Sequence, residues 1–253
     1  MSIKNAGLLY VSLFAFGGEI SLKYLIADLV TEFSPKFDNL KKLCEAFIYN
    51  GNRSIDVNLS VSDEYIEKLH KKMTDESTIE NAEEFAYSGV FNRAIIKHNA
   101  MLIHSSAICY NGGAYLFSAR SGVGKSTHTK LWLKAFPDKV EIINDDKPVV
   151  RLVDNIPIVF GTPFDGGSGI ANNKSAPLKA VVFLERGTEN EIRKATSQEI
   201  LNNLYFSTVR FINRVDADLL LKNIEKIMKS AEFYIMKCNM DISAAYISRD
   251  YII

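Results

Sequence analysis

The chain has 253 residues, of which 47% are hydrophobic, 24% charged and 11% aromatic. This composition is typical of a globular protein and excludes a largely disordered, collagenous or low-complexity chain. Thirty basic and thirty acidic residues give a net charge of zero, so the overall charge does not favour a nucleic-acid or membrane partner. The length allows one large domain or two smaller ones.

The three cysteines, Cys44, Cys109 and Cys238, are far apart and odd in number, which argues against a disulfide framework and a clustered zinc site. The longest uncharged apolar stretch, residues 7–18, is shorter than the ~20 residues of a membrane-spanning helix. Residues 16–19 also make a poor signal-peptide cleavage site. We therefore expect a cytoplasmic protein with free thiols.

The N-terminal third has a mixed pattern. Residues 8–16 are rich in aromatic and branched side chains and predict a strand, whereas residues 19–33 match both helix and strand. Residues 57–61 alternate like a half-buried strand. The most polar stretch, residues 63–84, carries eight carboxylates and three lysines, which predicts a solvated surface helix and a loop. We place a boundary there, with an N-terminal α+β region of unassigned role over residues 1–84.

The second predicted domain covers residues 85–253. It begins with a helix over residues 85–97, whose apolar face contains Phe85, Val90 and Phe91. Later helices are predicted over residues 125–135, over about 216–228 with Asp216 or Asp218 as the cap, and over 241–249. Short strands are predicted at residues 106–110, 114–117, 140–143, 149–153, 156–160, 180–184 and 233–238. Strands mixed with helices and hairpins predict an α/β domain with a mixed sheet.

The strongest motif is the glycine-containing loop SARSGVGKST at residues 118–127, between a predicted strand and a predicted helix. Glycines at 122 and 124 let backbone N–H groups converge on phosphate oxygens, and the helix N-terminus adds further donors. Lys125 supplies a charge to the β- and γ-phosphates, and the Ser126 hydroxyl is a candidate Mg²⁺ ligand. Ala119 stands where the standard Walker A motif (P-loop) has its first glycine. The predicted nucleotide-binding residues are Ser121, Gly122, Val123, Gly124, Lys125, Ser126 and Thr127.

The second motif is the acidic pair Asp145 and Asp146 at the end of a predicted strand. One carboxylate could hold Mg²⁺ and the other could accept the proton of an attacking hydroxyl. The glycine-dense segment 164–169 is either a mobile lid or a plain connection. Lys174, Arg186 and Arg210 are cations that could meet an anion, although surface solvation is the ordinary role of such residues.

Three segments together resemble the ordered motifs of HPr kinase/phosphorylase-related kinases, which share their P-loop fold with phosphoenolpyruvate carboxykinase. They are MLIHSSA at residues 101–107, SGVGKS at 121–126 and NDD at 144–146. The resemblance covers residues 95–185 and implies a mixed-sheet P-loop core. It also draws attention to His104, because the family has a histidine before the loop. Thr127 departs from the family, in which an acidic residue is typical at this place.

The resemblance implies an ATP- and Mg²⁺-dependent kinase that transfers the γ-phosphoryl group to a serine or other hydroxyl of a peptide or protein. The catalytic residues would be Asp146 as base, Asp145, His104 and Lys125, with Ser126 and Asp145 as metal ligands; the two aspartates could exchange roles. Two alternatives stay open, a small-metabolite kinase and a non-catalytic nucleotide-binding regulator. The expected partners are a nucleotide and a hydroxyl-bearing substrate, with no nucleic acid and no membrane; homo-oligomerisation is left open.

Overall fold

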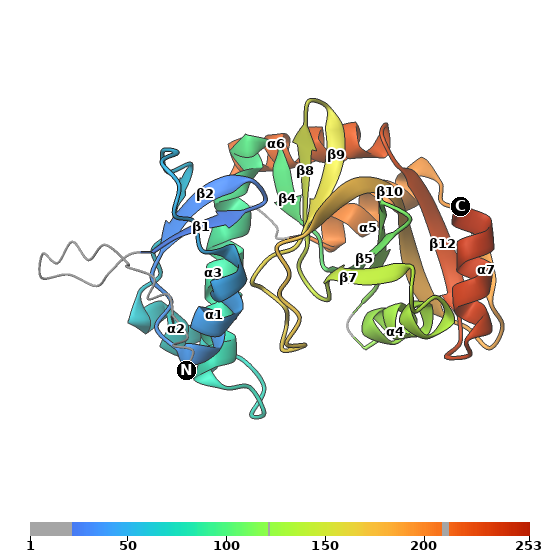
Figure 1. Ribbon diagram of the computed structural model, residues 1–253, viewed down its shortest axis with the longest axis horizontal. Coiled ribbons are helices and arrows are strands. Elements are labelled where there is room, and N and C mark those ends of the chain that lie inside the picture. The colour runs from blue at the N-terminus through green and yellow to red at the C-terminus, as the bar shows by residue number, and fades with distance from the viewer. Residues whose placement is uncertain (1–21, 121, 209–212) are drawn as a thin grey trace, which may run out of the picture.

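The computed structural model describes residues 22–120, 122–208 and 213–253. It is a mixed α/β structure in which an N-terminal hairpin and its helices lie beside a curved mixed sheet (Figure 1). The strand predicted at residues 8–16 lies outside the described residues.

An N-terminal hairpin forms in the described part of the ambiguous stretch, residues 22–33. It consists of β1 (Leu22–Ile26) and β2 (Leu29–Phe33), which pair antiparallel. Ala27 and Asp28 connect them with φ angles of 55° and 58°, the left-handed values of a two-residue hairpin turn. The short strand β3 (Val57–Asn58) adds parallel to β2, so the strand predicted at 57–61 forms only in its first part.

The helices of this region are α1 (Asp38–Cys44), the 3₁₀ turn η1 (Glu45–Phe47), α2 (Asp63–His70), α3 (Ile79–Ile95) and the 3₁₀ turn η2 (Ile96–His98). Helix α2 is the predicted surface helix. Helix α3 runs through residue 84, and the domain boundary predicted there stays a prediction.

Two expectations for α3 are wrong. Glu83 and Glu84 are not solvated, because both are buried. Phe85 is not part of an apolar face, because 52% of it is exposed. The reason is that α3 is buried on several sides, against the N-terminal hairpin and against β4 (Ala100–Leu102), so one helical stripe does not describe it.

The main sheet has nine strands. Its order is β4-β8-β9-β10-β6-β5-β7, with β12 added to β10 and β11 added to β12. β10 runs parallel to β6 and β12, and the remaining pairs are antiparallel, so the predicted mixed sheet is confirmed. The strands after β4 are β5 (Ser105–Tyr110), β6 (Gly113–Ser118), β7 (Val140–Asn144), β8 (Val149–Val153), β9 (Ile156–Phe160), β10 (Ser175–Arg186), β11 (Glu191–Lys194) and β12 (Glu232–Cys238).

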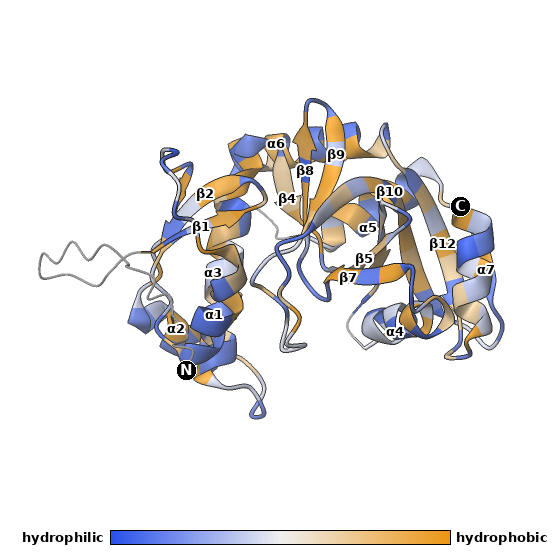
Figure 2. Cartoon of the chain, viewed as in Figure 1, coloured by the Kyte–Doolittle hydropathy of each residue, from blue (hydrophilic) through white to orange (hydrophobic). Residues whose placement is uncertain are grey.

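Helices cover both faces of this sheet, because one core cluster joins it to α5 (Ser197–Phe206) and α6 (Arg214–Met228) and another joins it to α4 (Lys125–Ala135) and α7 (Ser243–Ile252). Figure 2 shows that the strands between these helices are largely apolar. Alternate residues of β6 point to opposite faces. Leu116 packs with the cluster of α5 and α6, and Phe117 packs with that of α4 and α7. No helix in the described part is both long and apolar enough to cross a bilayer.

The cap of α6 corrects the expectation of Asp216 or Asp218. The cap is Asn213, whose side-chain oxygen accepts a hydrogen bond from the Asp216 N–H at 2.8 Å. Helix α5 was not predicted, although Thr196 and Glu199 form a capping box at its start.

Buried His128 in α4 should make stability depend on pH. The Trp132 indole donates to its Nε2 at 3.2 Å, and burial lowers the pKa of His128 to about 4. Between pH 6.5 and 4, His128 is therefore protonated in the unfolded chain but stays neutral in the folded protein. The free energy of unfolding should fall as the pH falls through this range, by about 3 kcal/mol from this group.

Urea unfolding of the wild type and of His128→Gln, measured from pH 7 to pH 4, checks this expectation. The variant should lose the contribution of this one proton and show a flatter pH dependence. Identical pH dependences would contradict the buried neutral histidine.

Candidate active site

The glycine loop joins the end of β6 to the start of α4. Gly122 and Gly124 have φ angles of 75° and 123°, which L side chains rarely adopt. A Cβ added at Gly122 would meet no atom within 4 Å, so the backbone here is open to a ligand. Gly124 is the N-cap of α4, and no side chain caps this helix start. The loop therefore presents uncapped helical N–H groups on an open backbone, a geometry that suits an anion.

Lys125, the first residue of α4, extends toward His104. Its Nζ lies 3.0 Å from Nε2 of His104, which stands between β4 and β5. Burial lowers the pKa of Lys125, while the negative charges of Asp146 and Asp145 act in the opposite direction. Both carboxylates are thus close enough to influence the loop lysine.

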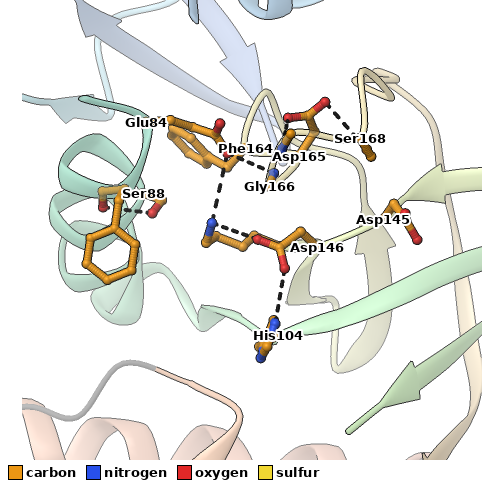
Figure 3. A network of polar contacts seen from close by, with 12 residues as sticks. Glu84, Ser88, His104, Asp145, Asp146, Phe164, Asp165, Gly166 and Ser168 are labelled. Carbon is orange, nitrogen blue, oxygen red and sulfur yellow. Dashed lines mark hydrogen bonds and ion pairs between the residues drawn. The ribbon is translucent and has the colours of Figure 1, made fainter. Parts of the chain in front are cut away.

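His104 connects the loop lysine to the acidic pair. Its Nε2 lies 3.1 Å from Oδ1 of Asp146 (Figure 3). The same nitrogen lies 3.0 Å from Nζ of Lys125. In a neutral ring this nitrogen can donate to Asp146 or accept from Lys125, but not both. His104 can therefore hydrogen-bond with Asp146 or with Lys125, and a charged ligand nearby could change which of the two it chooses.

The Asp146 carboxylate has a cation on its other side. Its Oδ2 lies 2.7 Å from Nζ of Lys147. Burial acts to raise the pKa of Asp146, but the hydrogen bond from His104 and the positive charge of Lys147 outweigh burial and hold this pKa well below its ordinary value. Asp146 is therefore ionised at neutral pH.

Asn144 fixes the backbone of the acidic pair. Its side-chain oxygen accepts hydrogen bonds from the N–H groups of Asp146 and Lys147 at 2.9 and 2.7 Å, and its Nδ2 donates to the Thr162 carbonyl at 3.0 Å. Asn144 is fully buried at the end of β7. It thus fixes the backbone from which the Asp146 side chain reaches His104.

Asp145 points in a different direction from Asp146 (Figure 3). Its Oδ1 accepts a hydrogen bond from the Ser106 hydroxyl at 2.5 Å, and the residue is nearly buried. The two adjacent acids therefore have separate surroundings, which is the arrangement that two different roles require.

Two residues of this site, Lys147 and Glu84, were missed by the sequence analysis. Glu84 of α3 lies 3.9 Å from the Lys147 ammonium and accepts the Gly166 N–H at 2.9 Å. Burial raises its pKa, with Lys147 opposing. A Cβ on Gly166 would lie 2.6 Å from the Asp146 carboxyl group, so only glycine fits here. The start of segment 164–169 is thus packed against the site, and Phe164 is fully buried.

Removing the Lys147 charge should destabilise the protein strongly. The substitution Lys147→Met leaves Asp146 and buried Glu84 as neighbouring carboxylates without their cation, a change that costs about 3 kcal/mol in buried pairs. The loss should grow from pH 5 to pH 8, because protonation of Glu84 relieves it at low pH. Urea unfolding at pH 5 and at pH 8 measures this loss of stability, and Lys139→Met on the surface is the control. Equal stability of the two variants at pH 8 would contradict the pairing of Lys147 with Asp146 and Glu84.

The site lies between two cavities that share His104, Phe206 and Ser207. One, of about 510 Å³, contains the start of the glycine loop at Ser118, Ala119 and Arg120. The other, of about 490 Å³, contains Asp146 and Lys147. A ligand on the loop and a second ligand beside Asp146 could therefore approach each other at His104.

Of the residues predicted for the site, the structure brings Lys125, His104 and Asp146 into one chain of contacts. Gly122, Val123, Gly124, Ser126 and Thr127 lie on the loop and the first turn of α4, and Ser121 lies outside the described residues. The described side chains form no group of three or more His, Cys, Asp or Glu arranged for a metal. Lys174 pairs with Glu141 on the surface, Arg186 contacts the Gly122 carbonyl, and Arg210 is outside the described part.

Comparison with known proteins gives little further information. No protein-family model matches the sequence, and no curated protein matches it. A solved structure, the HPr(Ser) kinase/phosphatase from Coxiella burnetii, is similar at 13% sequence identity, over 51% of this chain and 99% of that chain, with a TM-score of 0.28. So weak a likeness assigns no activity to this chain, and the function has to be argued from the site itself.

Proposed function

We propose that the protein is an ATP- and Mg²⁺-dependent phosphotransferase that moves a γ-phosphoryl group to a hydroxyl of a peptide or protein. The observation that carries this proposal is the continuous contact from Lys125 through His104 to Asp146. It joins an anion-binding loop to an ionised carboxylate, the two parts that phosphoryl transfer needs.

The loop residues would bind the phosphates of the nucleotide. The open backbone at Gly122 and the uncapped amides of α4 supply N–H donors, and Lys125 supplies a positive charge. Desolvation of Lys125, which lowers its pKa, also strengthens its attraction for an anion. These groups would stabilise negative charge on the transferred phosphoryl group.

Asp146 would orient the acceptor hydroxyl and take its proton. The oxygen of the acceptor forms a bond to the transferred phosphorus, the bond from that phosphorus to the β-phosphate oxygen breaks, and the hydroxyl proton passes to Asp146. Its low pKa makes Asp146 a weak base, so orientation is its larger contribution and the proton leaves late in the reaction. His104 and Lys147 occupy one lone pair on each oxygen, which leaves lone pairs for the acceptor.

A hydroxyl and a carboxylate oxygen are donors of the type that suits a magnesium ion shared with a nucleotide. Mg²⁺ commonly takes one or two protein oxygens and completes its shell with phosphate oxygens and water. The Ser126 hydroxyl on the first turn of α4 and the Asp145 carboxylate would be the protein ligands. Mg²⁺ bound there would neutralise phosphate charge.

Transfer of labelled γ-phosphate from ATP to a panel of serine peptides and small alcohols tests the proposal. Incorporation into a peptide that requires Mg²⁺ is the expected result. Tight ATP binding without transfer to any acceptor would favour the nucleotide-binding regulator instead. Transfer to alcohols alone would make the protein a metabolite kinase.

A further inference from the structure

The cavity beside Asp146 has two well-fixed walls. Helix α3 forms one wall and residues 206–208 form the other. The backbone N–H of His104 donates to the Ser207 carbonyl at 2.6 Å, and the side chain of Asn92 in α3 donates to the Thr208 hydroxyl at 3.1 Å. The second wall is thereby tied both to the catalytic histidine and to α3, so the cavity is a built feature of the fold.

The α3 wall presents three residues at four-residue spacing, Phe85, Gly89 and Arg93, which therefore lie along one side of the helix. The Phe85 ring is half exposed, and a Cβ added at Gly89 would meet no atom within 4 Å. The wall thus offers an aromatic ring, then a hollow, then a cation. At 1.5 Å per residue it is about 12 Å long, which matches three to four residues of an extended peptide.

Arg93 is available to an anionic ligand. Its side chain is exposed in the cavity wall, and no residue of the described part forms an ion pair or hydrogen bond with it. Lys147, the other cation of the cavity, is already paired with Asp146 and Glu84. A guanidinium recognises a carboxylate with two parallel hydrogen bonds, so Arg93 suits an acidic side chain.

We infer that this cavity docks an extended, acidic and apolar peptide segment, with its hydroxyl residue at Asp146, an apolar side chain against Phe85 and an acidic side chain at Arg93. This inference rests on the proposed function. Exposed aromatic residues from three elements, Tyr65, Phe85 and Phe206, surround the cavity. Aromatic residues and arginine are the side chains that dominate protein-binding surfaces, and their spread exceeds what a small alcohol would cover.

Fluorescence anisotropy with two labelled ten-residue peptides tests the docking site without requiring turnover. Both peptides contain a central serine flanked by leucine and phenylalanine; one has two glutamates three and four residues from the serine, and the other has lysines there. With a non-hydrolysable ATP analogue present, the acidic peptide should bind at least ten times more tightly. Arg93→Glu should remove or reverse this preference, whereas Lys97→Glu, an exposed charge reversal one turn later, should keep it.

A pair of substitutions at Gly89 tests the hollow. Gly89→Trp should fill the hollow and abolish peptide binding, whereas Gly89→Ala adds one methyl group in open space and should preserve binding.

Three results would overturn the inference: equal binding of the two peptides, no binding of either peptide, or an unchanged preference in Arg93→Glu. Transfer of the γ-phosphate to the same peptides is measured separately. Binding of the acidic peptide without phosphate transfer would contradict the proposed kinase activity. Phosphate transfer with no preference between the acidic and basic peptides would contradict the docking site.

Discussion

Asp146→Asn should reduce phosphoryl transfer by about 100- to 10,000-fold, the usual contribution of a positioned acid or base, and leave ATP affinity nearly unchanged. Asparagine keeps the size of the side chain and an oxygen that can accept from His104, 3.1 Å away in the wild type. It loses the negative charge that orients the acceptor hydroxyl and accepts its proton. Single-turnover transfer from labelled ATP measures the loss, and equilibrium titration with ATP measures the affinity.

The matched control is Asp138→Asn, the same chemical change at an exposed position after α4. It should transfer phosphate at the wild-type rate. Thermal unfolding of both variants separates a chemical effect from a folding defect, since Asp146 also pairs with Lys147. A folded Asp146→Asn protein with undiminished transfer would show that another group orients the acceptor.

Lys125→Met should weaken ATP binding by about 10- to 100-fold, which corresponds to the ~1.5–3 kcal/mol of a hydrogen bond to a charged group. The substitution removes the ammonium group and retains most of the unbranched side chain. Because burial lowers the pKa of Lys125, its charge is costly in the free protein, so the variant should fold normally. Isothermal titration with ATP and with AMP measures the effect, which should be larger for ATP.

Lys134→Met, in the last turn of the same helix, is the control for Lys125. It changes the same charge on an exposed surface and should bind ATP as the wild type does. A Lys125→Met protein with ATP affinity within twofold of the wild type would contradict the assignment of the loop as the phosphate site.

Local signals in the sequence were sufficient to predict many strands of the main sheet and the glycine loop before α4. β8, β9 and α4 have the predicted bounds, because hydrophobic alternation and turn residues define them within a few positions. Asp154 and Asn155, for example, adopt the left-handed φ values of 50° and 63° that the hairpin between β8 and β9 requires. His104 drew attention only through the family resemblance of the segments that contain it and Lys125, and its contact with Lys125 was not predicted.

Contacts between distant positions were not predictable in this way. Glu84 lies in the most polar stretch of the chain, yet it is 97% buried, with 3% exposed, because Gly166 and Lys147 surround it after folding. Phe85 has the hydrophobicity of a core residue but lies at a cavity. The first hairpin was ambiguous because Ala27 and Asp28 form its turn without a glycine. In each case tertiary packing overrides local preference.

A structure of the protein with a non-hydrolysable ATP analogue and Mg²⁺ would show whether the glycine loop and the Asp146 carboxylate serve one ligand. We expect a triphosphate on the amides of Gly122 and Gly124, with its terminal phosphate beside Lys125 and His104 and facing the cavity of Asp146. A triphosphate bound elsewhere, or one whose terminal phosphate points away from His104, would contradict this expectation.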